Sequence, residues 1–97
     1  MEFVNRIELC GVVGAVRTYD FHGNTFYNFS LCVNSALGNV VETNWFNCKW
    51  CPGKDDDAGK IVKDNMVHLE GRFSNIRYTG ADGNPAASYE VKVQKVY

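Results

Sequence analysis

The stretches Asn5-Arg6-Ile7-Glu8-Leu9-Cys10-Gly11 and Val67-His68-Leu69-Glu70-Gly71-Arg72-Phe73 follow the same plan. Each alternates apolar and polar residues and then reaches a glycine. Alternation gives a side-chain period of two, so one face of such a strand is apolar and the other can meet solvent or a ligand. A glycine within a strand marks a bend or the close approach of another backbone. Two such strands in a short chain predict a small, tightly curled barrel.

Length and net charge limit the classes of protein to which this chain can belong. We expect one domain, residues 1–97, because two halves of this length would each be too small for a core. The net charge is −1, so any surface that binds anions must be local, with the acidic residues elsewhere. The first residues are neither cationic nor apolar, and no apolar run approaches the ~20 residues that cross a bilayer. The expected location is the cytoplasm.

The chain contains four cysteines, Cys10, Cys32, Cys48 and Cys51. In a reducing cytosol, buried free thiols are the expected state. Cys48 and Cys51 have CxxC spacing, but a zinc site needs four ligands, and neither His22 nor His68 has a partner at metal-binding spacing. We therefore expect no metal and no cofactor. No nucleophile has an evident base and no phosphate-binding glycine loop is present, so we do not expect an enzyme.

Alternation and turn residues predict five strands, at residues 5–19, 25–34, 40–50, 66–73 and 88–96. Turn formers occupy 22–24 and 80–85, and a polar loop with three consecutive aspartates follows the third strand. Residues 61–64 allow one helical turn at best. The pattern fits an all-β, five-stranded oligonucleotide/oligosaccharide-binding (OB) Greek-key barrel, with a long first strand and a hairpin arm between the fourth and fifth strands. Other small barrels share this periodicity.

Several segments match one family in order and in rough spacing. They are Asn5-Arg6-Ile7-Glu8-Leu9-x-Gly11-x-Val13-Gly14, Asn28-Phe29-Ser30-Leu31-Cys32-Val33-Asn34, Glu42-Thr43-Asn44-Trp45-Phe46-Asn47, Val67-His68-Leu69-Glu70-Gly71-Arg72-Phe73 and Tyr78-Thr79-Gly80-Ala81-Asp82-Gly83. In these segments the chain resembles the bacterial single-stranded DNA-binding protein (SSB) family. The resemblance implies an OB fold that binds single-stranded DNA without strong sequence preference, protecting exposed strands in replication, recombination or repair.

The resemblance also implies which residues meet the nucleic acid. Bases stack on aromatic rings, at roughly 1–3 kcal/mol each, while cations follow the phosphates. Trp45 and Tyr78 match two base-stacking positions of the family. Trp50 has the opposite strand parity to Trp45, so either a bulge restores the register or Trp50 belongs to the core or an interface. The candidate phosphate contacts are Lys49, Arg72, Arg77, Arg6, Arg17 and Lys54.

Three aromatic residues around the first hairpin either stack on a ligand or pack: Tyr19, Phe21 and Tyr27. Two departures from the family favour an alternative function. The sequence as given ends after the predicted fifth strand, so we expect no acidic tail of the kind by which the family recruits repair enzymes, and the loop before the fourth strand is short and acidic. The alternative is an OB-fold protein-interaction module, or a primosome-type accessory protein, with weak or no DNA binding. An oligosaccharide-binding OB domain has only the fold in its favour.

The long first strand also bears on assembly. A domain of this size is marginally stable alone, and pairing this strand with its copy would cover an edge that otherwise invites aggregation. We expect a homo-oligomer, either a symmetric dimer or a tetramer.

Overall fold

The computed structural model describes residues 1–97 and is almost entirely β-structure. Its elements are β1 (Ile7–Phe21), β2 (Asn24–Leu37), β3 (Val40–Trp50), the 3-10 helix η1 (Ala58–Lys60), β4 (Met66–Thr79) and β5 (Pro85–Val96). The strands close into a barrel in the order β1-β2-β3-β5-β4, with β3 and β5 parallel and all other neighbours antiparallel. This order is that of the OB fold. The predicted five-stranded barrel, its long first strand and its hairpin arm are confirmed.

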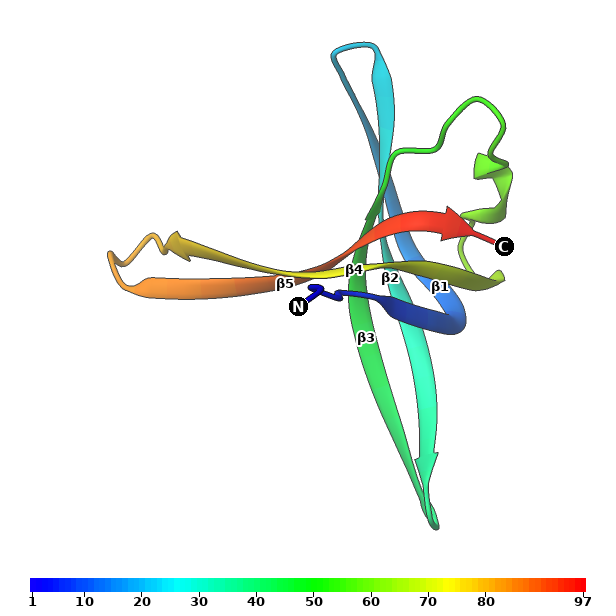
Figure 1. Cartoon of the computed structure of the whole chain (residues 1–97), viewed down its shortest axis with the longest axis vertical. Coiled ribbons are helices and arrows are strands. Elements are labelled where there is room, and N and C mark those ends of the chain that lie inside the picture. The colour runs from blue at the N-terminus through cyan, green and yellow to red at the C-terminus, as the bar shows by residue number, and fades with distance from the viewer.

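Three hairpins extend beyond the barrel as separate arms, formed by β1–β2, β2–β3 and β4–β5 (Figure 1). The β2–β3 arm reverses at Gly38-Asn39, where the φ of Gly38 is 63°. A two-residue turn with positive φ matches the twist of the flanking strands. Three strands, β2, β4 and β5, are therefore longer than predicted, whereas β1 and β3 have the predicted lengths. The turn between β2 and β3 takes two residues, although the predicted strands left residues 35–39 between them. The single helical turn lies at Ala58–Lys60, before the expected position, because the Asp57 side chain accepts a hydrogen bond from the Gly59 amide.

The core is built from alternate residues of all five strands together with Ile61. Its members are Leu9, Val13, Phe29, Leu31, Cys48, Trp50, Ile61, Val67, Leu69, Val91 and Val93. Burial of this apolar surface is the main favourable contribution to folding. Because inward residues alternate with outward ones, the core also fixes which side chains stand on the outer face of the barrel.

The glycines of the two repeated stretches let neighbouring backbones approach. A Cβ atom at Gly11 would overlap the carbonyl oxygen of Cys32, and one at Gly71 would overlap the carbonyl oxygen of Lys92. The sequence-based expectation of close backbone approach at these positions is confirmed. The structure contains no helix with the length and apolar character needed to span a membrane.

Candidate nucleic-acid interface

One row of outward side chains crosses all five strands. The register places Arg17 of β1 opposite Asn28 of β2, and Asn28 opposite Lys49 of β3. Lys49 then stands opposite Lys92 of β5, and Lys92 opposite Arg72 of β4. We call Arg17, Lys49, Lys92 and Arg72 the cationic row. Neighbouring strands lie ~4.8 Å apart, so the fold brings four cations from distant parts of the sequence onto one rung of the sheet.

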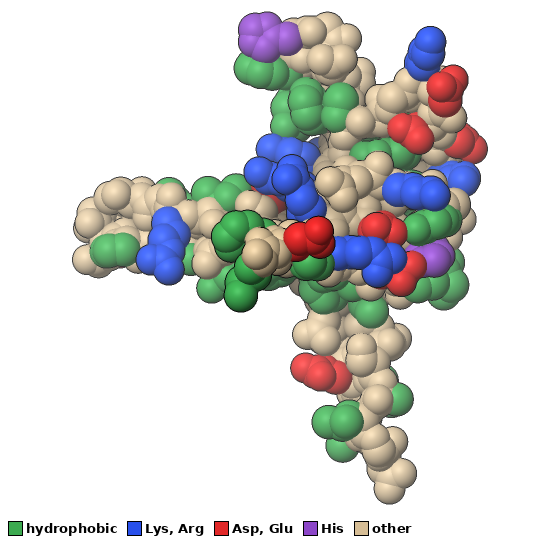
Figure 2. All heavy atoms as spheres, viewed as in Figure 1, with side chains coloured by type: hydrophobic (Ala, Val, Ile, Leu, Met, Phe, Trp, Pro, Cys, Tyr) green, Lys and Arg blue, Asp and Glu red, His purple; other side chains and the backbone are tan.

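The charge of the cationic row is not neutralised within the protein. The ion pairs of the structure involve only Arg6 and His68 as cations. Like charges directly opposite each other in a sheet are destabilising. A local positive surface therefore exists on a chain whose net charge is −1. Figure 2 shows Lys and Arg side chains gathered where the β1–β2 arm meets the base of the β4–β5 arm.

Trp45 stands on the same outer face, four residues before Lys49 on β3 and opposite Cys32 of β2. Its side chain is 63% exposed. The indole lies against Gly14, where an added Cβ would be 2.9 Å from Cζ3 of Trp45. A glycine at this position thus makes room for the ring. An exposed indole beside unpaired cations has the composition that base stacking and phosphate binding require.

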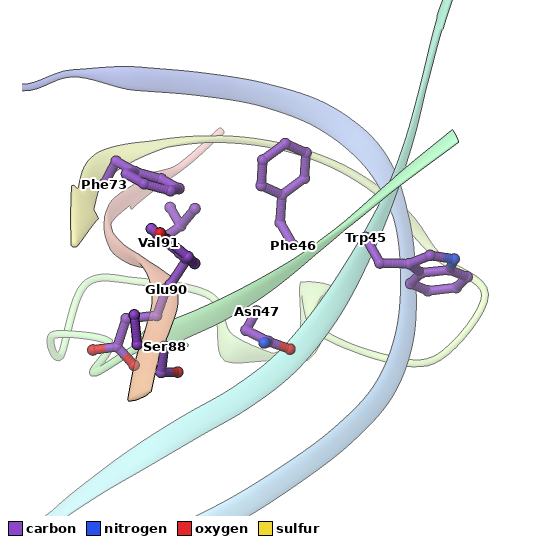
Figure 3. Close-up of a pocket in the computed structure, with 9 residues that line it drawn as sticks. Trp45, Phe46, Asn47, Phe73, Ser88, Glu90 and Val91 are labelled. Carbon is purple, nitrogen blue, oxygen red and sulfur yellow. The ribbon is translucent and has the colours of Figure 1, made fainter. Parts of the chain in front are cut away.

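A cleft opens beside Trp45 because β3 and β5 pair only at Cys48–Val91 and Lys49–Lys92 and are apart at the residues that precede these two pairs. We call this hollow of about 450 Å³ the β3–β5 cleft. It is lined by Trp45, Phe46, Asn47, Phe73, Ala87, Ser88, Tyr89, Glu90 and Val91. Phe73 and Tyr89 stack on one wall with ring centroids 5.7 Å apart. Figure 3 shows Phe46 and Phe73 on one side of β3 and Trp45 pointing away from them.

A second hollow of about 400 Å³ adjoins the cleft and includes part of the cationic row. Its lining residues are Ala15, Arg17, Asn28, Phe29, Ser30, Asn47, Cys48, Lys49 and Glu90. Asn47 and Glu90 line both hollows. The two hollows therefore adjoin at Asn47 and Glu90, but the rings of Phe46, Phe73 and Tyr89 have the strand parity of the core, opposite to that of Lys49 and Trp45.

The structure brings four of the predicted site residues, Trp45, Lys49, Arg17 and Arg72, onto this outer face. The other predicted residues lie elsewhere. Tyr78 is 52% exposed on the β4–β5 arm and does not line the cleft. Arg77 precedes it and so points to the opposite face of the arm, beside Tyr89. Lys54 is exposed in the loop after β3.

For Trp50 the structure decides between the two predicted readings in favour of the core, and Arg6, whose phosphate contact stays a prediction, lies outside the cationic row. Trp50 is 2% exposed and packs against Tyr27, with ring centroids 6.3 Å apart. The register of β3 with β2 continues without a bulge, so Trp50 points inward, opposite to Trp45. Arg6 is engaged by Glu70, with Nε 2.8 Å from Oε1 and a terminal nitrogen 3.1 Å from Oε2. Its charge is therefore already balanced by a carboxylate.

Sequence reasoning missed Lys92 and the Phe73–Tyr89 stack. The alternation of Lys92 with Val91 and Val93 does indicate an outward side chain. Its position beside Lys49, however, depends on the parallel pairing of β3 with β5. A further aromatic pair lies on the β1–β2 arm, where Tyr19 and Phe26 stack with centroids 5.3 Å apart and Lys49 Nζ lies 5.9 Å from the Tyr19 centroid.

The cysteines are all free, but only Cys48 is buried, whereas Cys10 and Cys51 are exposed. The expectation of buried thiols is therefore wrong for these two. Burial raises the pKa of the Cys48 thiol to about 12, which keeps it protonated and unreactive at neutral pH. The structure places no group of three or more His, Cys, Asp or Glu side chains where they could hold a metal ion.

Comparison with known proteins places the fold. No protein-family model matches the chain, and no curated protein matches it in sequence. Among solved structures, the chain is similar to the Plasmodium falciparum SSB in complex with single-stranded DNA, with a TM-score of 0.81 and 19% sequence identity. The match covers 95% of this chain and 88% of the Plasmodium chain. The likeness establishes that the chain has an SSB-like OB fold.

Proposed function

We propose that residues 1–97 form one OB domain that binds single-stranded DNA without strong sequence preference and protects exposed strands in replication, recombination or repair. The cationic row holds phosphates, and Trp45 provides a surface on which bases stack. The observation that carries the proposal is the row of four unpaired cations beside an exposed indole. The motif resemblance to the SSB family supports it, as does the similarity to a structure solved with single-stranded DNA.

The acidic residues next to this surface are few. The aspartates at 55–57 serve their own loop, since Asp56 accepts a hydrogen bond from the Gly53 amide and Asp57 from the Gly59 amide. Glu8 and Glu70 pair with His68 and Arg6 on the β1–β4 side of the barrel. An overall negative chain can thus bind an anionic polymer, because these acidic residues lie away from the cationic row and Glu90 is the one acidic residue that lines the two hollows.

The test is a titration of intrinsic tryptophan fluorescence with oligo(dT) and oligo(dC) at several salt concentrations. Each neutralised phosphate contributes about −0.7 to the slope of log K against log salt for single strands. If all four cations of the row contact phosphates, the slope is about −3. Trp45→Phe should abolish most of the quenching, because Trp50 is buried. Absence of any fluorescence change at low salt would contradict the proposal.

The alternative is an OB-fold protein-interaction module, or a primosome-type accessory protein, with weak or no DNA binding. One observation favours it: the tip of the β2–β3 arm exposes Leu37, Val40 and Val41, and the chain has no Lys or Arg between Arg17 and Lys49. Exposed apolar patches mark protein contacts. Under this alternative, L37S/V41S would abolish a protein association while oligonucleotide binding was absent throughout.

We also propose that the chain forms a homo-oligomer, as a dimer or a tetramer. Residues 7–11 of β1 pair with β4 along one edge, whereas pairing with β2 begins only at Val12. The free edge of this segment can pair with the same segment of a second copy. Light scattering with size-exclusion chromatography measures the assembly, and a monomer at micromolar concentration would contradict it.

A further inference from the structure

We infer that the stacked rings of Tyr19 and Phe26 on the β1–β2 arm form a second surface for nucleic-acid bases, on the far side of the cationic row from Trp45. The inference rests on the proposed binding of single-stranded DNA and extends that site onto an arm. A bound strand then crosses the barrel from Trp45 to the β1–β2 arm. Its bases stack at both ends, and its phosphates lie over the cations between them.

The Tyr19–Phe26 pair stands on the same face of the sheet as the cationic row. The two residues are opposite each other in the β1–β2 register, and each is two positions from the pair Arg17–Asn28. Alternation therefore places both rings on the face that carries Arg17. Figure 2 shows hydrophobic side chains on this arm directly beside the Lys and Arg side chains at its base. The rings thus continue the proposed binding surface beyond the barrel.

Neither ring of the pair belongs to the core. The core and the partly buried side chains packed against it include Tyr27, but not Tyr19 or Phe26. Tyr27 has the opposite parity and packs against Trp50. Tyr19 is 39% exposed and Phe26 is half-buried. Their rings are nearly parallel, with an interplanar angle of 11° and centroids 5.3 Å apart. The pair therefore forms a flat aromatic surface outside the core, of the kind on which bases stack.

The charges around the pair favour an anionic ligand. Lys49 Nζ lies 5.9 Å from the Tyr19 centroid, over the ring, and Arg17 is two residues before Tyr19 on the same face. Asp20 is the only acidic residue in β2 or in the part of β1 that pairs with it. It has the opposite parity and accepts a 2.7 Å hydrogen bond from the Thr25 hydroxyl. A base stacked on the pair therefore has two cations within reach of its phosphate, and the carboxylate of the arm lies on the other face.

The spacing of the two stacking surfaces suits a strand that runs over the cations. Phe26 and Cys32, the residue opposite Trp45, are six positions apart on β2, which corresponds to about 20 Å along the strand. Asn28 lies between them, in line with the cationic row. A single nucleotide cannot reach both surfaces. The arm therefore contributes to binding only when the oligonucleotide is long enough to cross the row.

A matched pair of variants tests the contribution of this ring stack. Phe26→Leu removes one ring of the proposed surface. Tyr97→Leu removes one ring of the His68–Tyr97 stack, which also has a lysine nearby, with Lys95 Nζ 4.6 Å from the Tyr97 centroid. That stack adjoins a carboxylate, because the Tyr97 hydroxyl donates a 2.7 Å hydrogen bond to Glu70. We therefore expect phosphates to be repelled there.

Affinity for oligo(dT) is measured by the fluorescence anisotropy of a dye-labelled oligonucleotide at several salt concentrations. Phe26→Leu should weaken binding at least about fivefold, the lower limit for one stacked base. Its salt slope should equal that of wild type, because no cation is lost. Tyr97→Leu should keep the wild-type affinity, and so should Phe26→Tyr, which retains a ring. Wild-type affinity in Phe26→Leu, or an equal loss in Tyr97→Leu, would overturn the inference.

Cross-linking of the wild-type protein separates a lost contact from a disturbed fold. Iodouracil replaces thymine at one position of oligo(dT) at a time, and light then links it to an aromatic ring in contact with it. We expect cross-links to Trp45 from some positions and to Tyr19 or Phe26 from others. Absence of any cross-link on the β1–β2 arm, with binding intact, would overturn this inference alone. Failure of wild type to bind any oligonucleotide would instead overturn the proposed function.

Discussion

Lys49 and Lys92 stand directly opposite each other in the short parallel ladder between β3 and β5. Arg72 follows on the next strand, so three cations are consecutive across the sheet. Cross-strand pairs of like charge are destabilising, on the scale of roughly 0.2–1 kcal/mol. The arrangement lowers the stability of the free protein and would be relieved by a bound polyanion. The same cations therefore favour binding of a polyanion and lower the stability of the free protein.

Lys92→Gln should consequently make the protein more stable and a weaker binder. We expect the free energy of unfolding in urea to rise by up to ~1 kcal/mol. The salt slope of oligo(dT) binding should fall in magnitude by about 0.7, which corresponds to one lost phosphate contact. Lys63→Gln is the control, because Lys63 is exposed in the loop before β4, outside the row. Equal effects of the two substitutions would show that only net charge matters.

Trp45→Ala should weaken binding with little effect on stability. The side chain is exposed, and the loss of one stacked base costs about 1–3 kcal/mol, or about 5- to 150-fold in affinity. Trp45→Phe should retain most of the affinity. Trp50→Ala should instead unfold the protein or cost about 3–5 kcal/mol of stability, because Trp50 is part of the core. A large loss of stability in Trp45→Ala, measured by urea denaturation, would contradict this assignment.

Gly14→Ala tests whether the position of the Trp45 ring matters. The new methyl group would meet the indole and the hydroxyl of Ser30. Both are side chains that can move, so we expect a folded protein with a shifted Trp45 emission maximum and severalfold weaker binding. Gly11→Ala meets the backbone carbonyl of Cys32 instead, which cannot move without disturbing the sheet. It should lower the melting temperature strongly, and a melting temperature equal to that of wild type would contradict the steric argument.

Alternation along the chain was sufficient to predict the number and order of the strands. Trp45 and Lys49 lie four residues apart within the strand predicted at 40–50, which gives them the same parity, and both stand on the outer face of β3 in the structure. Alternation could not decide the side of Trp50, because a bulge is invisible in the local pattern. The arms were predicted too short, since polar pairs such as Asn34–Thr43, joined by a 2.8 Å side-chain hydrogen bond, extend the hairpin without apolar alternation.

The cationic row was beyond prediction from the sequence for a different reason. The sequence shows Arg17 and Arg72 only as two separate basic residues near the motifs. Their common row depends on four separate strand pairings, one of them parallel. Long-range register is set by the packing of the whole barrel rather than by any local segment. The same holds for the β3–β5 cleft, which exists because β3 and β5 are apart before they meet at Cys48–Val91.

The Glu70 carboxylate makes stability depend on pH. It accepts hydrogen bonds from Arg6 at 2.8 and 3.1 Å and from the Tyr97 hydroxyl at 2.7 Å. These contacts lower the pKa of Glu70 to about 2, and the hydrogen bonding from Arg6 is the largest cause. In the unfolded chain the pKa returns to about 4.3. Because the folded value is the lower one, the stabilisation is complete above the unfolded pKa and is lost as pH falls from about 4.3 toward about 2.

Glu70→Gln isolates this contribution from that of the other carboxylates. The difference in free energy of unfolding between wild type and Glu70→Gln should be largest at neutral pH and should shrink toward pH 2, where Glu70 in the wild type is itself becoming neutral. Urea denaturation at a series of pH values between 2 and 7 measures it. Glu42→Gln, whose carboxylate has no ion-pair partner, should show a small difference throughout. A difference for Glu70→Gln that stayed constant down to pH 2 would mean that Arg6 and Tyr97 contact Glu70 without favouring its charged form.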